Sequence, residues 1–382
     1  MTRLRRSPCR LVAWLLCHLA LVLSFGCGPR GSGTPVWLAH IATLSGPDKQ
    51  AGESAARGIR LAVKEFNDNE QALGHPLKVI HSDTHGKLEA FEAEATRLVA
   101  VNRISFLLGG STPAEVEQLD HARATVLTPC GARPRGVSDA VYFTGLTPLQ
   151  QGKALARFIA QESRVESALL VEDDRGEEAS LVAEALVREL PLAAAKDGKA
   201  TALDRLRLAK DVKPGEFAKQ LDERLKESAA KVIVFAGRAE DLQRLGAVAR
   251  PVLFAGAEGV ASTVQQQRHD FKEVYWVTAF VSDADTSRAK EFRARFKSAF
   301  QEEADVHAAL AYENLRLLYE AMVRTKDSLS VQRIREELGQ TKDYAGLTGP
   351  LSFTPERQLR RQAFVVRWEA GAAKTVKRYE PD

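Results

Sequence analysis

The chain has 382 residues, of which 45% are hydrophobic and 27% charged, with 26 Gly and 15 Pro. This composition is typical of a globular protein of two or three domains, and it excludes a disordered, collagen-like or disulfide-dense chain. Residues 1–26 hold four of the 54 Lys and Arg residues and none of the 50 acids, so the rest of the chain balances at 50 against 50. A balanced body lacks the clustered cations that nucleic-acid binding requires, so we expect no nucleic-acid partner.

Residues 1–26 have the three parts of a secretory signal peptide. Residues 1–10 carry the four arginines, Leu11–Phe25 is mostly apolar, and the small residues Ser24 and Gly26 precede the expected cleavage point. The apolar run is shorter than the roughly 20 residues that cross a membrane, although a retained anchor helix is the alternative. We expect secretion across the inner membrane into the periplasm.

Cys27 follows Leu23–Gly26 in an arrangement similar to a bacterial lipobox, and residues 27–35 form a Gly-rich tether. The segment departs from that pattern because Leu23 stands one place early and Phe25 is bulky. We expect a lipidated Cys27 that anchors the chain to the membrane, with ordinary cleavage nearby as the alternative. Of the four cysteines only Cys130 then remains in the folded body, so an internal disulfide is excluded.

Short apolar runs rich in β-branched residues alternate with segments of 3.6-residue periodicity along the body of the chain. The predicted strands are Val36–Leu44, Leu77–Ser82, Ser105–Leu108, Thr125–Thr128, Ala168–Val171, Val232–Ala236, Val252–Ala255 and Val274–Val281. Because these runs are nearly continuous in apolar residues, each is expected to be buried on both faces of a parallel sheet covered by helices.

The distribution of the predicted strands indicates two sheets, with about four strands before Gly145 and another group from Ala168 onward. Three helices and two short strands complete the chain: Arg288–Glu302, His307–Thr325, Val331–Gly339, Leu351–Thr354 and Ala363–Trp368. The sequence therefore predicts an α/β fold of two doubly wound parallel-sheet lobes. A cleft between two such lobes is where a ligand binds.

Common catalytic and nucleotide-binding motifs were not found: there is no GxGxxG after a predicted strand, and no P-loop, GxSxG, HExxH or CxxC. His81, Asp83 and His85 stand at alternate positions, which would place them on one face of a strand, and their types suit zinc. The alternative is that they line the loop leaving the strand. We expect no catalytic residue, metal or cofactor.

Two segments have the pattern of a helix N-terminal capping box with proline at the first helical position, Thr112–Glu115 and Thr147–Gln150. Capping alone is a sufficient explanation of both. In the first segment, a strand ending in Gly109–Gly110 also leaves backbone N–H groups directed toward the cleft. With the Ser111 or Thr112 hydroxyl, these donors are candidates to hold a ligand carboxylate.

Three charged residues follow predicted strands of the second sheet: Glu258, Arg175 and Arg238. Glu258 is either a solvated loop residue or a carboxylate that faces a ligand ammonium. The two arginines are either surface residues paired with neighbouring acids or residues that face the cleft.

Several further segments, taken together, indicate a family. They are Ala42–Pro47, Gly58–Ala62, Asp83 at the end of a strand, Gly109–Ala114, Thr128–Ala132, Gly256–Val260 and Gly346–Phe353. In this order and spacing they resemble the leucine/isoleucine/valine-binding proteins, which have the type I periplasmic solute-binding fold. The resemblance extends from about Val36 to Trp368.

This resemblance implies a cleft that holds an amino acid, with its carboxylate at Ser111 and Thr112 and its ammonium at Glu258. The turn at Cys130 and Ala132 would contribute too, but Ala132 replaces a threonine hydroxyl of the family and Ala51 stands where an aromatic is common. Arg175 and Arg238 align loosely with aromatic residues of the pocket wall. Two guanidiniums in place of aromatics favour an anionic or larger polar ligand.

The resemblance also implies hinge strands near Thr144–Thr147, Val277–Phe280 and Gly349–Leu351. We expect the first lobe to comprise residues 36–146 and 279–348, and the second lobe residues 147–278 and 349–382. The expected function is capture of a small solute for the permease of an ABC importer. A ligand-sensing receptor subunit of the same fold and an α/β cleft enzyme are the alternatives.

Overall fold

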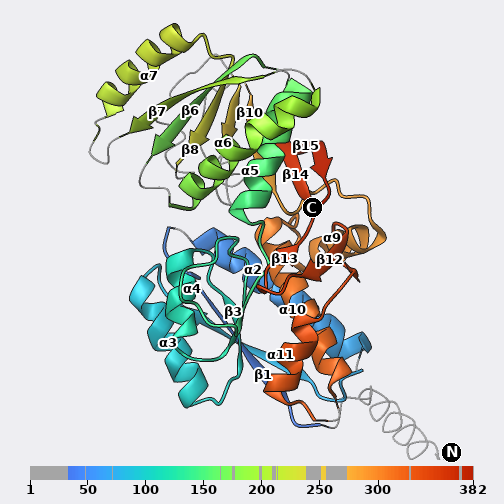
Figure 1. Cartoon of the computed structure of the whole chain (residues 1–382). Coiled ribbons are helices and arrows are strands. Elements are labelled where there is room, and N and C mark those ends of the chain that lie inside the picture. Colours follow the sequence, from blue (N-terminus) through green and yellow to red (C-terminus); the bar gives the residue numbers. More distant parts are fainter. Residues whose placement is uncertain are drawn as a thin grey trace, which may run out of the picture.

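The structure is a computed structural model of the chain (Figure 1). It describes residues 33–47, 49–70, 72–163, 165–173, 177–197, 200–208, 212, 214–237, 251–254, 273–326, 328–369 and 372–381. Cys27, Arg175, Arg238 and Glu258 lie outside the described residues, as does the expected signal peptide 1–26.

Five parallel strands form the sheet of the first lobe, the lower one in Figure 1. They are β1 (Val36–Ala42), β2 (Leu77–Asp83), β3 (Phe106–Gly109), β4 (Thr125–Thr128) and β5 (Val141–Phe143). Their order across the sheet is β2-β1-β3-β4-β5, and every adjacent pair is parallel. The order changes direction between β1 and β3, and a crevice forms outside the carboxyl ends of the strands at such a point.

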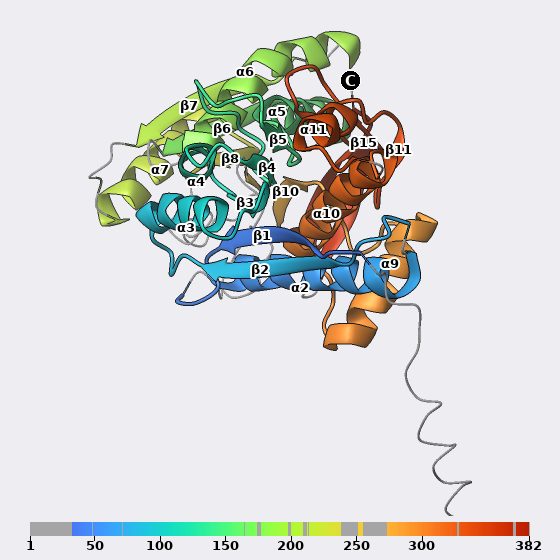
Figure 2. The same ribbon diagram turned by 90° about the horizontal axis from the view of Figure 1, so that it is seen from below.

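Helices cover both faces of this sheet. On one side lie α2 (Lys49–Glu65), α9 (Ser287–Phe300), α10 (Val306–Arg324) and α11 (Val331–Gly339), and on the other α3 (Leu88–Ala100) and α4 (Pro113–Asp120). Leu38 and Leu108 belong to the core under α2 and α10, whereas their neighbours Ala39 and Leu107 belong to the core under α3 and α4. Alternate residues thus enter opposite cores, which is why the strands are apolar throughout. Figure 2 shows α2 lying along β1 and β2.

The second lobe is built on a seven-stranded sheet of order β15-β14-β10-β9-β8-β6-β7. Its strands are β6 (Ser167–Asp173), β7 (Ala202–Leu208), β8 (Val232–Ala236), β9 (Val252–Phe254), β10 (Val274–Thr278), β14 (Ala363–Glu369) and β15 (Ala372–Tyr379). The five from β10 to β7 are parallel, and β14 and β15 are antiparallel to their neighbours. The helices α5 (Pro148–Arg157) and α6 (Glu177–Asp197) lie on one face, and α7 (Pro214–Ser228) lies on the other.

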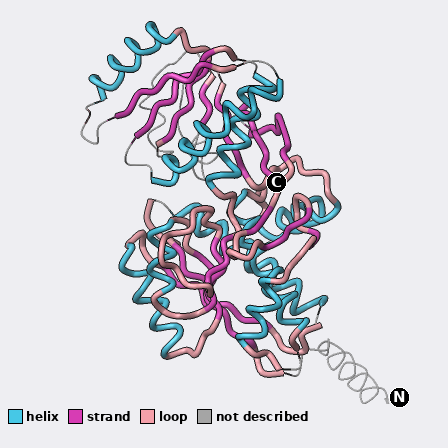
Figure 3. The backbone as a smooth tube through the Cα atoms, in the orientation of Figure 1, coloured by secondary structure: helices cyan, strands magenta, loops and turns pink. Residues whose placement is uncertain are grey.

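The chain passes between the lobes after β5, after β10 and before β14, so each lobe is built from separate parts of the sequence (Figure 3). The prediction assigns residues 349–382 to the second lobe. However, β11 (Tyr344–Ala345), β12 (Pro350–Phe353) and β13 (Leu359–Arg360) form a small sheet of their own beside β5. The N–H of Phe143 donates to the Arg357 carbonyl at 2.9 Å, so the chain reaches the seven-stranded sheet only after residue 360.

The predicted α/β architecture of two parallel-sheet lobes is confirmed, and each predicted strand and helix corresponds to an element of the structure. Five strands were not predicted: β5, β7, β11, β13 and β15. Two short π-helical segments, Phe66–Glu70 and Phe158–Ser163, extend α2 and α5. Among the described helices, none has the length and apolar character that crossing a membrane requires.

Candidate functional site: a cavity at the carboxyl edge of the first sheet

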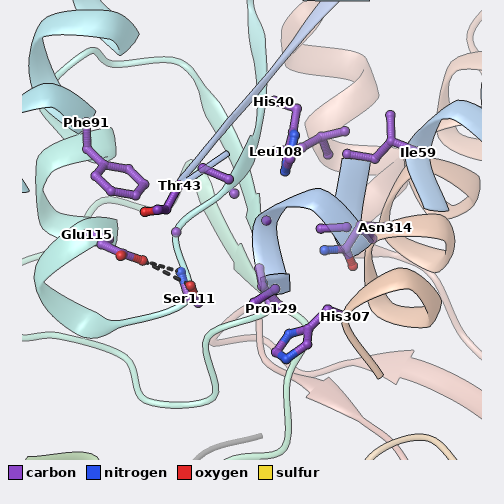
Figure 4. A pocket seen from close by; sticks show the side chains of 17 residues that line it. His40, Thr43, Ile59, Phe91, Leu108, Ser111, Glu115, Pro129, His307 and Asn314 are labelled. Carbon is purple, nitrogen blue, oxygen red and sulfur yellow. Dashed lines mark hydrogen bonds between the residues drawn. The ribbon is translucent and has the colours of Figure 1, made fainter. Parts of the chain in front are cut away.

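A cavity of about 200 Å³ opens at the carboxyl ends of β1 and β3, where the strand order changes direction (Figure 4). Thr43, Ser111 and His307 line its mouth and are at least partly exposed, whereas His40 and Asn314 at its floor are each 2% exposed. The volume is below the roughly 300–1,000 Å³ of pockets for drug-sized ligands, and it suits a smaller solute.

Two glycines allow the walls of the cavity to approach one another. A Cβ on Gly52 would lie 2.0 Å from the Thr43 carbonyl oxygen, so α2 passes directly against the loop after β1. Gly109 has a φ of +136°, and a Cβ there would lie 2.1 Å from the Ile41 carbonyl oxygen. A residue with a side chain at either position would push the carboxyl ends of β1 and β3 away from their neighbours.

The Ser111–Thr112 segment at the mouth forms the predicted capping box. The Thr112 hydroxyl accepts a bond from the Glu115 N–H at 3.3 Å. The Glu115 carboxylate in turn accepts bonds from the Ser111 N–H at 2.7 Å, the Ser111 hydroxyl at 3.1 Å and the Thr112 N–H at 3.2 Å. The donors that the sequence assigns to a ligand carboxylate therefore contact a carboxylate of the chain itself, as the dashed lines of Figure 4 show for Ser111. The second predicted capping box, at Thr147, is also present.

Cys130 and Ala132 lie in the turn after β4, and both are buried. The Cys130 N–H donates to the Thr128 hydroxyl at 3.0 Å, and its thiol donates to the Ala132 carbonyl at 3.2 Å. The Thr128 hydroxyl donates to the Gly110 carbonyl, which joins this turn to the one after β3. Pro129 lines the cavity and so places the turn beside it. The ligand contacts assigned to Cys130 and Ala132 stay a prediction.

His81, Asp83 and His85 do not converge on one point. Asp83 accepts bonds from the N–H groups of Leu44 at 2.8 Å and His85 at 2.9 Å, and so it fixes the loop after β1. Burial alone would raise the pKa of Asp83, but hydrogen bonds from the Ser45 side chain and these two N–H groups lower it to about 2. His81 turns instead toward β1. The described residues contain no group of three or more His, Cys, Asp or Glu side chains arranged to hold a metal ion.

The rings of His40 and His81 meet across neighbouring strands, with their Nδ1 atoms 3.0 Å apart. Burial, followed by the neighbouring His81 and the Arg60 guanidinium, lowers the pKa of His40 to about 3. Burial and Arg60 lower the pKa of His81 to about 4. Both rings are therefore neutral at pH 7, and one Nδ1 donates to the other. His40 presents an uncharged surface to the cavity.

Asn314 reaches the floor of the cavity from α10, on the same side as Ile59 of α2 (Figure 4). No hydrogen-bond partner of its side-chain oxygen Oδ1 exists among the described residues, although this oxygen is buried. The sequence interpretation did not include Asn314, His40 or His307. A polar residue among the buried Leu310, Leu317 and Leu318 of one helix was the available signal for Asn314.

Of the predicted site residues, the structure places Ser111 at the mouth and Ala51 in the wall of this cavity. Thr112 is one residue further along at the start of α4, and Cys130 and Ala132 are in the adjacent turn. The three predicted residues of the second lobe, Arg175, Arg238 and Glu258, lie outside the described residues.

The sequence matches the family described as periplasmic binding protein over residues 35–373. A search of curated proteins found no match. Among solved structures, the leucine binding protein LivK of Thermotoga maritima MSB8 has 18% identity and a TM-score of 0.75, over 91% of this chain and 99% of that one. The substrate binding protein LivJ of Streptococcus pneumoniae, in complex with isoleucine, has 20% identity and a TM-score of 0.75, over 91% and 100%. A solute binding protein of an ABC transporter from R. palustris, in complex with benzoate, has 16% identity and a TM-score of 0.70, over 91% and 97%.

These structures confirm the predicted type I periplasmic binding protein fold. The family match covers nearly the whole chain after the expected leader and tether, and it confirms the resemblance found in the sequence. It also identifies the protein as a binding protein rather than an enzyme. The chain belongs to the periplasmic binding protein family.

Proposed function

We propose that the protein binds an amino acid or a related small polar or anionic solute and delivers it to the permease of an ABC importer. The observation that carries this proposal is the cavity at the change of strand direction between β1 and β3. Ligands of open α/β sheets bind at such points, and the family consists of binding proteins. Two of the similar structures named above hold isoleucine and benzoate, and both of these ligands carry a carboxylate.

The proposed carboxylate site is the pair of N–H groups and the hydroxyl at Ser111 and Thr112. They already hold one carboxylate, that of Glu115, which supports their suitability for an anion. A ligand carboxylate would have to displace Glu115. The turn at Cys130 and Ala132 would complete this side through its backbone, and Glu258, Arg175 and Arg238 are the proposed contacts from the second lobe.

The proposed mechanism is hinge closure. A solute that contacts both lobes only when they are closed shifts the population toward the closed state. Three segments connect the lobes: one after β5, one after β10 and one before β14. Together they are the proposed hinge. For the third connection we propose residues 361–362, because β12 and β13 lie beside β5.

The proposed location is the periplasmic face of the inner membrane, with the chain held there by a lipid on Cys27. This part of the proposal rests on the sequence of the first 35 residues. Mass spectrometry of the mature N-terminus tests it: a diacylglyceryl-modified Cys27 is expected. An unmodified mature N-terminus would remove the anchor and leave the solute-binding proposal intact.

A thermal-shift screen against amino acids, aromatic acids, dicarboxylates and small amides tests the solute-binding proposal. At 100 times its dissociation constant, a ligand adds about 2.7 kcal/mol to the free energy of unfolding. Ala55 lines the cavity, and Ala55→Phe fills it and should abolish the response. Val101 is 73% exposed, so Val101→Phe adds a similar ring elsewhere and should keep the response. A response that survives Ala55→Phe would place the solute elsewhere.

A further inference from the structure

His307 is the residue of the described cavity lining whose side chain can carry a positive charge at the mouth. Its side chain is partly exposed, and Figure 4 shows the ring extending from the start of α10 on the side where Pro129 lies. The described residues give this imidazole no hydrogen bond, ion pair or ring contact. Its ring nitrogens are therefore available to a molecule that enters the mouth.

The start of α10 is held in place by contacts on both sides of His307. Just before it, the Asp305 carboxylate accepts the Ala308 N–H at 2.9 Å and the hydroxyl of Ser54, on α2, at 2.5 Å. Just after it, a Cβ on Gly58 of α2 would lie 2.1 Å from the Ala308 carbonyl oxygen, so the two helices are in direct contact there. His307 therefore presents its ring from a firmly packed part of the wall.

The other titratable residues of the described lining are His40 and Glu115. His40 is at the floor, and burial is the largest of the causes that lower its pKa to about 3, so it stays neutral from pH 6 to pH 8. The Glu115 carboxylate, on the α4 side of the mouth, accepts the N–H donors of its own capping box. Near the start of α10, Arg57 of α2 lies 3.2 Å from Glu302 and is paired with it. An anion that enters therefore finds in His307 the side chain of the described lining that can supply a positive charge.

A histidine side chain changes its charge between pH 5 and pH 8, and an imidazolium forms a charge-assisted hydrogen bond with a carboxylate. We propose that His307 selects the solute by charge, its imidazolium binding a second anionic group of a solute whose first carboxylate is held at Ser111 and Thr112. The inference rests on the proposed function, because the solute must enter this cavity. It adds a substrate class, acidic amino acids and dicarboxylates, and an affinity for them that rises as the pH falls.

Calorimetry with L-glutamate and L-glutamine tests this selection, because the two amino acids have the same length and differ only in the second acid group. At pH 6 the wild-type chain should bind glutamate at least about tenfold more tightly than glutamine, a difference of about 1.4 kcal/mol. At pH 8 the preference should fall to about threefold or less, because a histidine side chain loses its charge toward that pH. Succinate and succinamate are a second pair of this kind, without an ammonium group, and should show the same preference.

Two substitutions of His307 separate its charge from its bulk. His307→Gln keeps a polar side chain without a charge, so it should remove the preference for the acids at both pH values and leave glutamine affinity within about threefold. His307→Lys carries a positive charge at both pH values, so its preference for glutamate should persist at pH 8. His121→Gln is the matched control, because the His121 side chain is 56% exposed and lies outside the cavity lining; it should keep the wild-type preference and its pH dependence.

A preference for glutamate that survives in His307→Gln at pH 6 would overturn the selection by His307. So would a wild-type chain that prefers glutamine, that shows the same preference at pH 6 and pH 8, or that binds only solutes with a single acid group. Each of these results would leave the solute-binding function standing. A chain that binds none of the four probes and nothing else in the wider screen would instead overturn the proposed function together with the selection.

Discussion

Arg361 and Glu313 form a buried ion pair at the junction of the two lobes, with an Arg361 guanidinium nitrogen 2.8 Å from Oε2 of Glu313. Arg361 also donates to the Thr144 carbonyl, just after β5, and Glu313 accepts the Leu347 N–H. Next to Leu347, the Thr348 hydroxyl donates to the Ala279 carbonyl, just after β10. The pair is therefore bonded, directly or through one neighbour, to each of the three connections between the lobes.

Breaking this pair should destabilise the protein strongly. Arg361→Met leaves the Glu313 carboxylate buried without its partner, which costs about 3–5 kcal/mol in comparable cases. The double variant Arg361→Met/Glu313→Leu should recover much of that loss, because it leaves no unpaired charge. Urea unfolding of the two variants measures the difference. As a control, Lys49→Met breaks the exposed Lys49–Glu53 pair and should change the free energy of unfolding by less than about 1 kcal/mol. Equal losses in the single and double variants would contradict this account of the pair.

Glu115 should compete with an acidic ligand. Glu115→Gln removes the negative charge that occupies the Ser111 and Thr112 donors but keeps a side chain able to cap α4. Affinity for an amino-acid ligand identified by the screen should then rise about five- to tenfold, or about 1–1.4 kcal/mol. Glu117→Gln, on the exposed side of the same helix, is the control and should leave affinity unchanged. Weaker binding by Glu115→Gln would show that the ligand does not use these donors as a carboxylate would.

The backbone at Gly109 should tolerate no side chain. Gly109→Ala combines a positive φ with a contact of 2.1 Å to the Ile41 carbonyl oxygen, so β1 and β3 must separate at the mouth of the cavity. We expect a loss of roughly 2–4 kcal/mol and weaker solute binding. Gly136 also has a positive φ, of +82°, but nothing lies within 4 Å of a Cβ there. Gly136→Ala should therefore lose only about 1–2 kcal/mol and bind normally. Equal losses of stability and of solute affinity in Gly109→Ala and Gly136→Ala would refute the close approach of Gly109 to the Ile41 carbonyl oxygen.

The buried histidine pair should make stability depend on pH. The unfolded chain takes up protons on His40 and His81 near pH 6.5, whereas the folded chain does so only near pH 3 to 4. Lowering the pH through this interval therefore favours the unfolded state, on the order of a few kcal/mol between pH 7 and pH 4. Asp83, whose pKa is about 2 in the folded protein, adds its own loss mainly below pH 4. Urea unfolding across this range measures the slope, and His40→Asn/His81→Asn should flatten it above pH 4. A wild-type slope equal to that of the double variant would exclude the pair as its source.

The five strands that the sequence did not predict, β5, β7, β11, β13 and β15, are all at sheet edges. The prediction relied on continuous apolar runs, which mark strands buried on both faces. In β7, Ala202–Leu208, the exposed Arg205 and Arg207 alternate with Leu206 and Leu208 because one face is exposed, and exposed positions also alternate with less exposed ones along β15. The segment of β5 has only three residues, too few for a period to be recognised.

The mouth of the cavity could be predicted from the sequence and its floor could not. Ser111, Thr112 and the capping box follow from local sequence, because a helix N-terminus has a characteristic residue pattern. His40 and Asn314 lie within predicted apolar elements, where a single polar residue gives no indication of its partner. The contact between His40 and His81 depends on the register of β1 against β2, in which Val36 lies opposite Leu77, and pairing between strands 41 residues apart is not a local property.

Small-angle X-ray scattering with and without the solute found by the screen tests the central claim, that one solute draws two hinged lobes together. The account predicts a smaller radius of gyration at saturation, and no change for Ala55→Phe at the same solute concentration. Saturable binding to the wild-type chain with superimposable scattering profiles would contradict it.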